Sequence, residues 1–260
     1  MPDFDVATPH IARIYDYWLG GKDNFEADRQ AGDLALAATP TILPGVTANR
    51  RFLGRAVRYM ADEGNVRQFL DVGTGIPSAN NTHEVAQAID SDARVVYVDN
   101  DPIVLVHARA LLTGQPGTTA YIDADARDTG RILSEAAATL DFSRPVGVML
   151  IAVLHCVTDE DGPGRVVADL MAACAPGSFL AISHPARDQL DLAIKAEESL
   201  SKSMGMKVTF RTRDAVEKLF DGTELANPGV VPVQQWRPTS ELDTNSLPTA
   251  MWGGVARKGA

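Results

Sequence analysis

The chain has 260 residues, 45% of them hydrophobic, and a formal net charge of −10 at pH 7. This length and apolar content suffice for one large core, while the acidic balance argues against a nucleic-acid partner, which needs a basic surface to meet phosphates. Cys156 and Cys174 have no metal-ligand spacing, so we expect no metal site and a reducing compartment. Asp3 and Asp5 stand where a signal peptide carries positive charge. No apolar run reaches the roughly 18 residues of a membrane span, so we expect a cytoplasmic protein.

The beginning of the chain predicts a helical lead-in. Thr8 has the residue type of an N-cap and Gly20 that of a helix end. The predicted helices cover residues 8–22, 25–38 and 47–63, with a loop at 43–45. Neither an alternating strand pattern nor a linker separates this stretch from the rest. We therefore expect a single domain over 1–260, with a helical cap at 1–64 and a core at 65–260.

Tyr15 and the polar turn at 20–24, Gly-Gly-Lys-Asp-Asn, stand out within the predicted cap. A lid over a cofactor is one interpretation of such a turn. A turn that ends a helix and has no ligand role is an equally good one. Tyr15 and Asn24 are therefore candidate cofactor contacts, and Tyr15 is also a candidate catalytic residue.

Residues 67–78, Arg-Gln-Phe-Leu-Asp-Val-Gly-Thr-Gly-Ile-Pro-Ser, predict a strand, a tight turn and a helix. Glycine is needed where the backbone takes a positive φ or where a ligand approaches the main chain. A second predicted strand at 94–98 ends in Asp99-Asn100-Asp101-Pro102, the spacing of a βαβ unit whose second strand delivers a carboxylate to a ribose. Asp101 has a sufficient role as a helix cap, which leaves Asp99 as the expected ribose ligand.

Asp71 indicates which nucleoside-like ligand binds. A carboxylate at the end of the first strand would repel the pyrophosphate of a dinucleotide. S-adenosylmethionine carries no phosphate, and its sulfonium and ammonium are cations, so the same carboxylate would favour it. Position 78 is serine, so the third glycine of the dinucleotide fingerprint is absent. A nicotinamide-dependent oxidoreductase remains the less favoured alternative.

From Val66 onward, strand-like and helix-like stretches alternate, which predicts a doubly wound, mostly parallel Rossmann-like sheet of seven strands. The apolar run at 146–154 is typical of a central strand buried on both faces. The remaining strands are expected at 121–125, 179–183, 229–236 and 249–256, the last two as an antiparallel edge hairpin. Helices are expected at 78–88 and 102–112, from about 129, and at 164–174, 187–204 and 214–220.

Two histidines follow the fourth and fifth predicted strands. Ligands of open α/β sheets lie beyond the carboxyl ends of the strands, so His155 and His184 are candidate general bases. A lone histidine is more often an ordinary hydrogen-bonding residue, and that interpretation stays open for both.

Two motifs resemble those of class I S-adenosylmethionine-dependent methyltransferases. Asp71-Val-Gly-Thr-Gly75 is similar to their motif I, and Val98-Asp99-Asn-Asp-Pro102 to the acidic motif of their second strand. The opening, Thr8-Pro-His-Ile-Ala-Arg-Ile-Tyr-Asp-Tyr-Trp-Leu-Gly-Gly-Lys-Asp-Asn-Phe25, resembles the N-terminal signature of a bacterial S-adenosyl methyltransferase family. That family was once catalogued as a domain of unknown function and is abundant in actinobacteria. The similarity runs along the whole chain.

The resemblance implies S-adenosylmethionine as cofactor and S-adenosylhomocysteine as product. Asp71 with the backbone at Gly73 and Gly75 would hold the methionine part, and Asp99 the ribose. Asp125 falls where the family's adenine contact lies, although a turn or cap aspartate is the alternative. The cofactor contacts implied are Asp71, Gly73, Thr74, Gly75, Asp99, Asn100, Asp125, Ala126, His155, Tyr15 and Asn24.

The reaction expected is in-line methyl transfer to a small-molecule acceptor. A protein that binds the cofactor without transferring methyl, as a sensor or helper, remains an alternative. A nucleic-acid methyltransferase is less favoured, because Leu154-His-Cys-Val157 stands where an Asn/Asp-Pro-Pro-aromatic motif would follow the fourth strand. Residues 186–213 lie where such enzymes insert substrate-recognition structure, but their sequence identifies no acceptor, and nothing in the chain indicates an oligomeric state.

Overall fold

A computed structural model describes residues 5–39, 41–78, 80–104, 106, 117–189, 193–205, 207–240, 243 and 249–259. The described strands form one mixed sheet in the order β3-β2-β1-β4-β5-β8-β6, with β7 also paired to β8. Strands β1 to β5 are parallel, and β8 runs antiparallel to β5. The strands are β1 (Gln68–Val72), β2 (Arg94–Asp99), β3 (Thr119–Asp123), β4 (Gly147–Ile151), β5 (Phe179–Pro185), β6 (Glu224–Leu225), β7 (Val231–Pro232) and β8 (Met251–Arg257).

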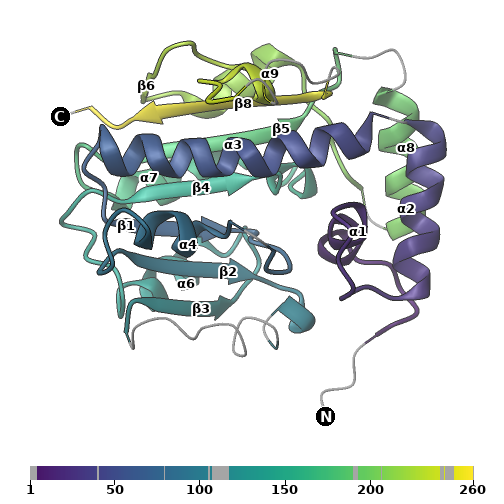
Figure 1. Cartoon of the computed structure of the whole chain (residues 1–260), viewed down its shortest axis with the longest axis horizontal. Coiled ribbons are helices and arrows are strands. Elements are labelled where there is room, and N and C mark those ends of the chain that lie inside the picture. The colour runs from purple at the N-terminus through teal and green to yellow at the C-terminus, as the bar shows by residue number, and fades with distance from the viewer. Residues whose placement is uncertain are drawn as a thin grey trace.

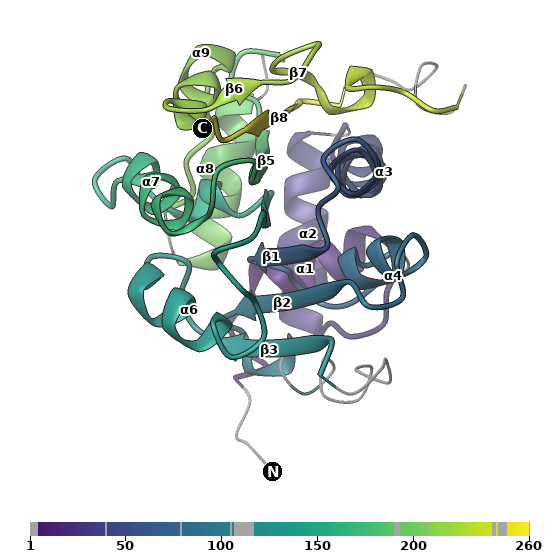
Figure 2. The ribbon, with the colours of Figure 1, turned by 90° about the vertical axis from the view of Figure 1, so that its left-hand side faces the viewer.

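The described helices cover both faces of the sheet and its carboxyl edge. Figure 2 shows α3 and α4 on one face and α6 and α7 on the other. The helices are α1 (Ile11–Trp18), α2 (Glu26–Ala38), α3 (Ile42–Asp62), α4 (Thr82–Gln87), α6 (Thr129–Ala136), α7 (Pro163–Ala173), α8 (Ala193–Met204) and α9 (Arg213–Glu217). Single 3₁₀ turns are η1 (Leu154–Cys156), η2 (Lys218–Phe220) and η3 (Val233–Gln235). No helix within the described ranges is long and apolar enough to cross a membrane.

The central strands are apolar because their side chains pack into two hydrophobic cores, one on each face of the sheet. Leu70 and Val148 pack with the α6 and α7 side, whereas Phe69 and Met149 pack with Phe52 of α3 on the other side. Side chains alternate between the two faces of a strand, so a strand covered on both faces reads as one apolar run. The doubly wound, mostly parallel sheet expected from the sequence is therefore confirmed.

A third apolar cluster joins segments far apart in the sequence. Ile14 of α1 and Ala35 of α2 pack with Leu200 and Met204 of α8 and with Phe210. Figure 1 shows α1, α2 and α8 together beyond the carboxyl ends of the parallel strands. The segment after β5 thus completes the N-terminal cap instead of standing apart from it.

The described residues form eight strands, one more than expected. The predicted strand at 229–236 is reduced to the two residues of β7, because Pro232 lacks an N–H and the chain then turns into η3. The additional short strand, β6, pairs with the end of β8. The predicted fourth strand ends at Ile151, and of its last three expected residues only Leu154 belongs to η1.

Several helix boundaries also differ from the expectation. The first helix starts at Ile11, with His10 as N-cap. The expected loop at 43–45 is the first turn of α3, where Pro44 is tolerated because its nitrogen needs no partner there. α4 starts only at Thr82 and α8 at Ala193. Of the helix expected at 102–112, residues 102–104 and 106 are helical, and the remainder lies outside the described residues.

Arg55 joins α3 to the segment before β8. Its Nη1 donates to Asp243 Oδ1 at 2.9 Å, and its Nε and Nη2 donate to the carbonyls of Trp236 and Val233 at 2.8 and 2.6 Å. Both partners of the ion pair are almost fully buried. Removing one partner of a buried ion pair leaves the other charge in a dry environment.

We expect Arg55→Met to lower the free energy of unfolding by about 3 kcal/mol, measured by urea denaturation. Arg58→Met on the exposed side of the same helix is the matched control and should stay within about 0.5 kcal/mol of the wild type. Equal effects of the two substitutions would contradict the structural role of Arg55.

Candidate active site

A cavity opens at the carboxyl ends of β1, β2 and β4, beneath α1. Its wall contains most of the residues that the sequence indicated as cofactor contacts. These are Tyr15, Asp71, Gly73, Thr74, Gly75, Asn100, Asp99, Asp125 and Ala126. Two candidates lie elsewhere: His155 lines an adjoining cavity, and Asn24 lines neither.

The loop after β1 requires both of its glycines. Gly73 has a φ of 73°, and a Cβ there would lie 2.2 Å from Cγ2 of Val153 in the loop after β4. Gly75 has a φ of 68°, but a Cβ there would meet only Ala12 at 4.0 Å. The backbone conformation therefore favours glycine at both positions, and close packing is a second reason that applies at 73 alone.

Asp99 fixes this loop to the end of β2. Its Oδ2 accepts from the Gly75 amide at 2.8 Å, and its Oδ1 accepts from the Asp101 amide at 3.0 Å. Burial raises the pKa of Asp99, while these two hydrogen bonds oppose the shift. Each carboxylate oxygen can accept a second hydrogen bond, so Asp99 can hold the loop and still bind a hydroxyl in the cavity.

Asp71 places a second buried carboxylate in the same wall. Its Oδ2 accepts from the Thr82 hydroxyl at 2.6 Å. Burial raises the pKa of Asp71 to about 6, against the hydrogen bond from Thr82 and the charge of Arg50. A carboxylate desolvated in this way gains more from a nearby cation than an exposed one does.

Asp125 lies two residues past the end of β3, whereas the sequence had suggested that it ends the strand. Arg127 donates to it from Nε at 2.8 Å and from Nη2 at 2.7 Å, and this pair holds the pKa of Asp125 below its ordinary value. The α6 cap is Asp128, whose side chain accepts from the Arg131 amide. Asp125 also accepts from the Arg127 amide, so a local turn bond coexists with its place in the cavity wall.

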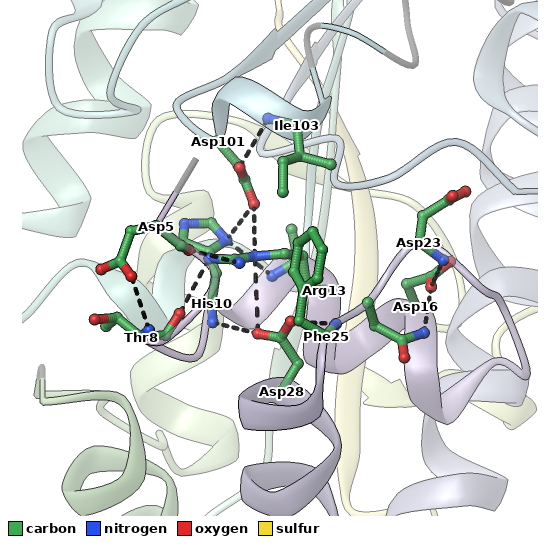
Figure 3. A network of polar contacts seen from close by, with 12 residues as sticks. Asp5, Thr8, His10, Arg13, Asp16, Asp23, Phe25, Asp28, Asp101 and Ile103 are labelled. Carbon is green, nitrogen blue, oxygen red and sulfur yellow. Dashed lines mark hydrogen bonds and ion pairs between the residues drawn. The ribbon is translucent and has the colours of Figure 1, made fainter. Parts of the chain in front are cut away.

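An ion-pair network holds α1 over the cavity (Figure 3). Arg13 Nε lies 3.3 Å and His10 Nδ1 3.0 Å from Asp101 Oδ2. Burial acts to raise the pKa of Asp101, but His10 and Arg13 hold it below its ordinary value. Asp28 of α2 accepts from the backbone amides of His10 and Phe25. The network thus links both cap helices to the residue that donates to Asp99.

The polar turn at 20–24 is organised by Asp16 of α1. Asp16 Oδ2 accepts from the Asp23 amide at 3.0 Å and from Asn24 Nδ2 at 2.8 Å. The side-chain oxygen of Asn24 accepts from Arg29. Asn24 is therefore engaged within the turn, which matches the interpretation of a helix-ending turn better than that of a cofactor contact.

Tyr15 lies where α1 meets α3 and lines both cavities. Its hydroxyl donates to the Val46 carbonyl at 3.2 Å and accepts from Asn49 Nδ2 at 3.0 Å. Burial raises the pKa of Tyr15, so the phenol is neutral. Asn49 and Arg50 also line the first cavity. Neither was expected there, because both lie inside a stretch whose sequence pattern indicates only an amphipathic helix.

The two candidate bases have different surroundings. His155 lies on η1 and lines the second cavity, and burial together with Arg211 lowers the pKa of His155 to about 4. His184 is fully buried and lines neither cavity. Its Nδ1 lies 2.9 Å from the Pro185 carbonyl, and its Nε2 lies 2.8 Å from Arg211 Nη1. His184 is thus a partner of Arg211 and does not face a ligand space.

Arg211 fixes the loop that carries His155. It donates to the carbonyls of Leu154 and Val157, both at 2.8 Å, and pairs with Asp159 at 2.7 Å. These partners lie more than 50 positions earlier in the chain, so no local pattern could have indicated them.

A family model described as S-adenosyl methyltransferase matches residues 1–259. The chain belongs to this S-adenosyl methyltransferase family. A DUF574 family protein from Streptomyces avermitilis is 41% identical, with a TM-score of 0.93 and coverage of 98% of this chain and 99% of that one. A methyltransferase candidate from Thermobifida fusca is 42% identical, with a TM-score of 0.94 and coverage of 100% and 98%. No curated protein matches the chain.

More distant structures share the fold. Human N-acetylserotonin methyltransferase, solved with S-adenosylmethionine, has a TM-score of 0.52 at 14% identity, with coverage of 95% of this chain and 62% of that one. The protein is thus an S-adenosylmethionine-dependent methyltransferase with a class I fold. The residues present fit this cofactor: two buried carboxylates suit a ligand with cationic groups and ribose hydroxyls, and the glycine loop leaves its backbone open to the cavity.

If Asp71 contacts the cofactor as expected, its raised pKa makes the affinity depend on pH, because only the ionised carboxylate attracts a cation. The affinity is then full well above pH 6 and is lost as the pH falls through that value. We expect the wild type to bind S-adenosylmethionine about tenfold more weakly at pH 5 than at pH 7, measured by isothermal titration. Asp71→Asn should bind more weakly at pH 7, and its affinity should change little between the two values. A wild-type affinity that is flat over this range would contradict the assignment.

Proposed function

We propose that this methyltransferase acts on a small-molecule acceptor and works as one domain. Residues 1–64 would cover the cofactor, and residues 65–260 would bind it. The observation that carries this proposal is that Asp71 and Asp99 lie buried in one cavity whose roof is α1. The net charge of −10 supports a small acceptor over a nucleic acid, which would need a basic surface.

The proposed roles follow from the position of each group along the cavity wall. Asp71 and the backbone at Gly73 and Gly75 would meet the methionine part, where the cationic groups are. Asp99 would accept from the ribose hydroxyls. Asp125 and Ala126, beyond the end of β3, would meet the adenine edge. The neutral Tyr15 would close the cavity from the cap.

Bound S-adenosylmethionine supplies a methyl group on an activated sulfonium leaving group. The protein has to align the acceptor with this group and exclude water. Such alignment can contribute on the order of 7–11 kcal/mol to lowering the barrier. The cap provides the alignment, since the network around Asp101 fixes α1 directly over the carboxyl ends of the strands.

The first experiment is isothermal titration with S-adenosylmethionine, S-adenosylhomocysteine and NAD. We expect both sulfur compounds to bind and NAD to show no binding, because Asp71 would repel its pyrophosphate. Binding of NAD with neither sulfur compound would overturn the proposed residue roles.

Asp99→Ala tests the ribose contact. Loss of a buried acceptor that two ligand hydroxyls need should weaken binding of S-adenosylhomocysteine by about 1–3 kcal/mol, read by titration. Asp99→Asn keeps an acceptor oxygen for the loop and should weaken binding of S-adenosylhomocysteine less than Asp99→Ala does. The matched control is Asp123→Ala, because Asp123 is the residue paired with Asp99 on β3 but is exposed and lines neither cavity. Near-normal affinity in Asp99→Ala would remove Asp99 from the site.

A further inference from the structure

A second cavity adjoins the cofactor cavity. The two share Ile11, Tyr15 and Ala152 in their walls. Ala152 directly follows β4 and has a φ of 52°, so the backbone turns sharply between the two spaces. A molecule in the second cavity would therefore face the cofactor site past Tyr15 and Ala152.

The second cavity is walled mainly by apolar side chains from the cap and from the end of the chain. They include Trp18, Ile42, Val46, Leu200, Phe210 and Met251. Of the described residues in this wall, none is Asp, Glu, Lys or Arg. A charged ligand would lose its hydration there and find no counter-charge, which is strongly unfavourable.

Three residues of this wall each have a buried polar side-chain atom that has no hydrogen-bond partner within the described part of the chain. These atoms are Nδ1 of His155 and the hydroxyl oxygens of Thr39 and Thr41. By contrast, the hydroxyls of Tyr15 and Thr249 in the same wall are already bonded to protein groups. A buried polar group left unpaired costs about 1–3 kcal/mol, so a ligand that pairs with one would recover part of that cost.

His155 is the group best suited to bind a neutral donor. Its ring is buried and close to the guanidinium of Arg211, which keeps it uncharged. A neutral imidazole retains a nitrogen lone pair that accepts a hydrogen bond. It also lies on η1, directly after the turn at Ala152 that separates the two cavities.

We propose that the second cavity binds the methyl acceptor, and that this acceptor is an uncharged small molecule with an apolar body and one hydroxyl that bonds to His155. This inference rests on the proposed function, since it names the acceptor class of the same methyl transfer. At neutral pH an aliphatic amine would be a cation and a carboxylic acid an anion. The described wall offers no counter-charge to either of them.

The transfer step balances with His155 as proton acceptor. A lone pair of the hydroxyl oxygen forms the bond to the methyl carbon, and the carbon–sulfur bond breaks with its electron pair left on sulfur. The hydroxyl proton passes to a ring nitrogen of His155. Oxygen becomes strongly acidic as the methyl carbon bonds to it, so even a weakly basic imidazole takes the proton. The nearby charge of Arg211 then favours release of that proton to water.

The test uses probes of one shape and different charge on the protein saturated with S-adenosylhomocysteine. They are 2-naphthol, naphthalene, 2-naphthoate and 2-naphthylmethylammonium, and the smaller set p-cresol, toluene, p-toluate and 4-methylbenzylammonium. We expect a neutral hydroxyl compound to bind at least about tenfold more tightly than its charged counterparts, which corresponds to 1.4 kcal/mol. If neither 2-naphthol nor p-cresol binds more tightly than the matching anion and cation, the inference is overturned.

His155→Leu separates hydrogen bonding from packing. We expect it to weaken binding of the hydroxyl compound about tenfold and to change the affinity for the matching hydrocarbon by no more than about twofold. Transfer of labelled methyl to the hydroxyl compound should be abolished. His155→Gln should restore part of the binding. Equal losses for the hydroxyl compound and the hydrocarbon in His155→Leu would show that His155 acts only in packing.

Leu200→Phe checks the location independently of His155. The larger side chain on α8 narrows the second cavity and should weaken binding of the hydroxyl compound and of the hydrocarbon alike. The affinity for S-adenosylhomocysteine should be unchanged. Unchanged binding of both would place them elsewhere and overturn the inference. Failure of S-adenosylhomocysteine itself to bind the wild type would overturn the proposed function, whereas normal cofactor binding with preference for charged probes would overturn the acceptor class alone.

Discussion

The carboxylate of Asp99 is the junction on which the site depends. One oxygen accepts from Gly75 and orders the loop after β1, and the other accepts from Asp101. Asp101 in turn anchors Arg13 and His10 of the cap. The cofactor loop, the end of β2 and the roof of the cavity are therefore joined through two neighbouring acidic residues, one facing the ligand space and the other facing the cap.

The sequence was sufficient for the parts of the site that local chemistry determines. A strand that ends in Asp71 and two glycines, followed at βαβ spacing by Asp99, predicts a nucleoside site and its cationic preference. The continuous apolar run of β4 likewise predicts that this strand is buried. Asp125 was expected as the adenine contact, and it lies in the cavity wall although the strand before it is shorter than expected, because the residues after a strand share the same edge of the sheet.

Features that depend on which side chains meet in the folded chain were not predictable. His184 reads as a candidate base until Arg211 is found bonded to its ring. Asn24 reads as a lid residue until Asp16 and Arg29 are seen to hold it. Pro44 suggested a loop because the pattern alone cannot tell the first turn of a helix from a break. For His184 and Asn24, side-chain contacts in the folded chain decide between two interpretations that the local sequence leaves open.

The cluster that joins α1 and α2 to α8 has a consequence for synthesis of the chain. Ile14 and Ala35 leave the ribosome long before Leu200 and Phe210, the residues that cover them. Apolar surface whose partner is still unmade is prone to wrong association, and long-range contacts of this kind slow folding. The cap over the first cavity is thus among the last parts of the protein to be completed, although its first helices are the first to be made.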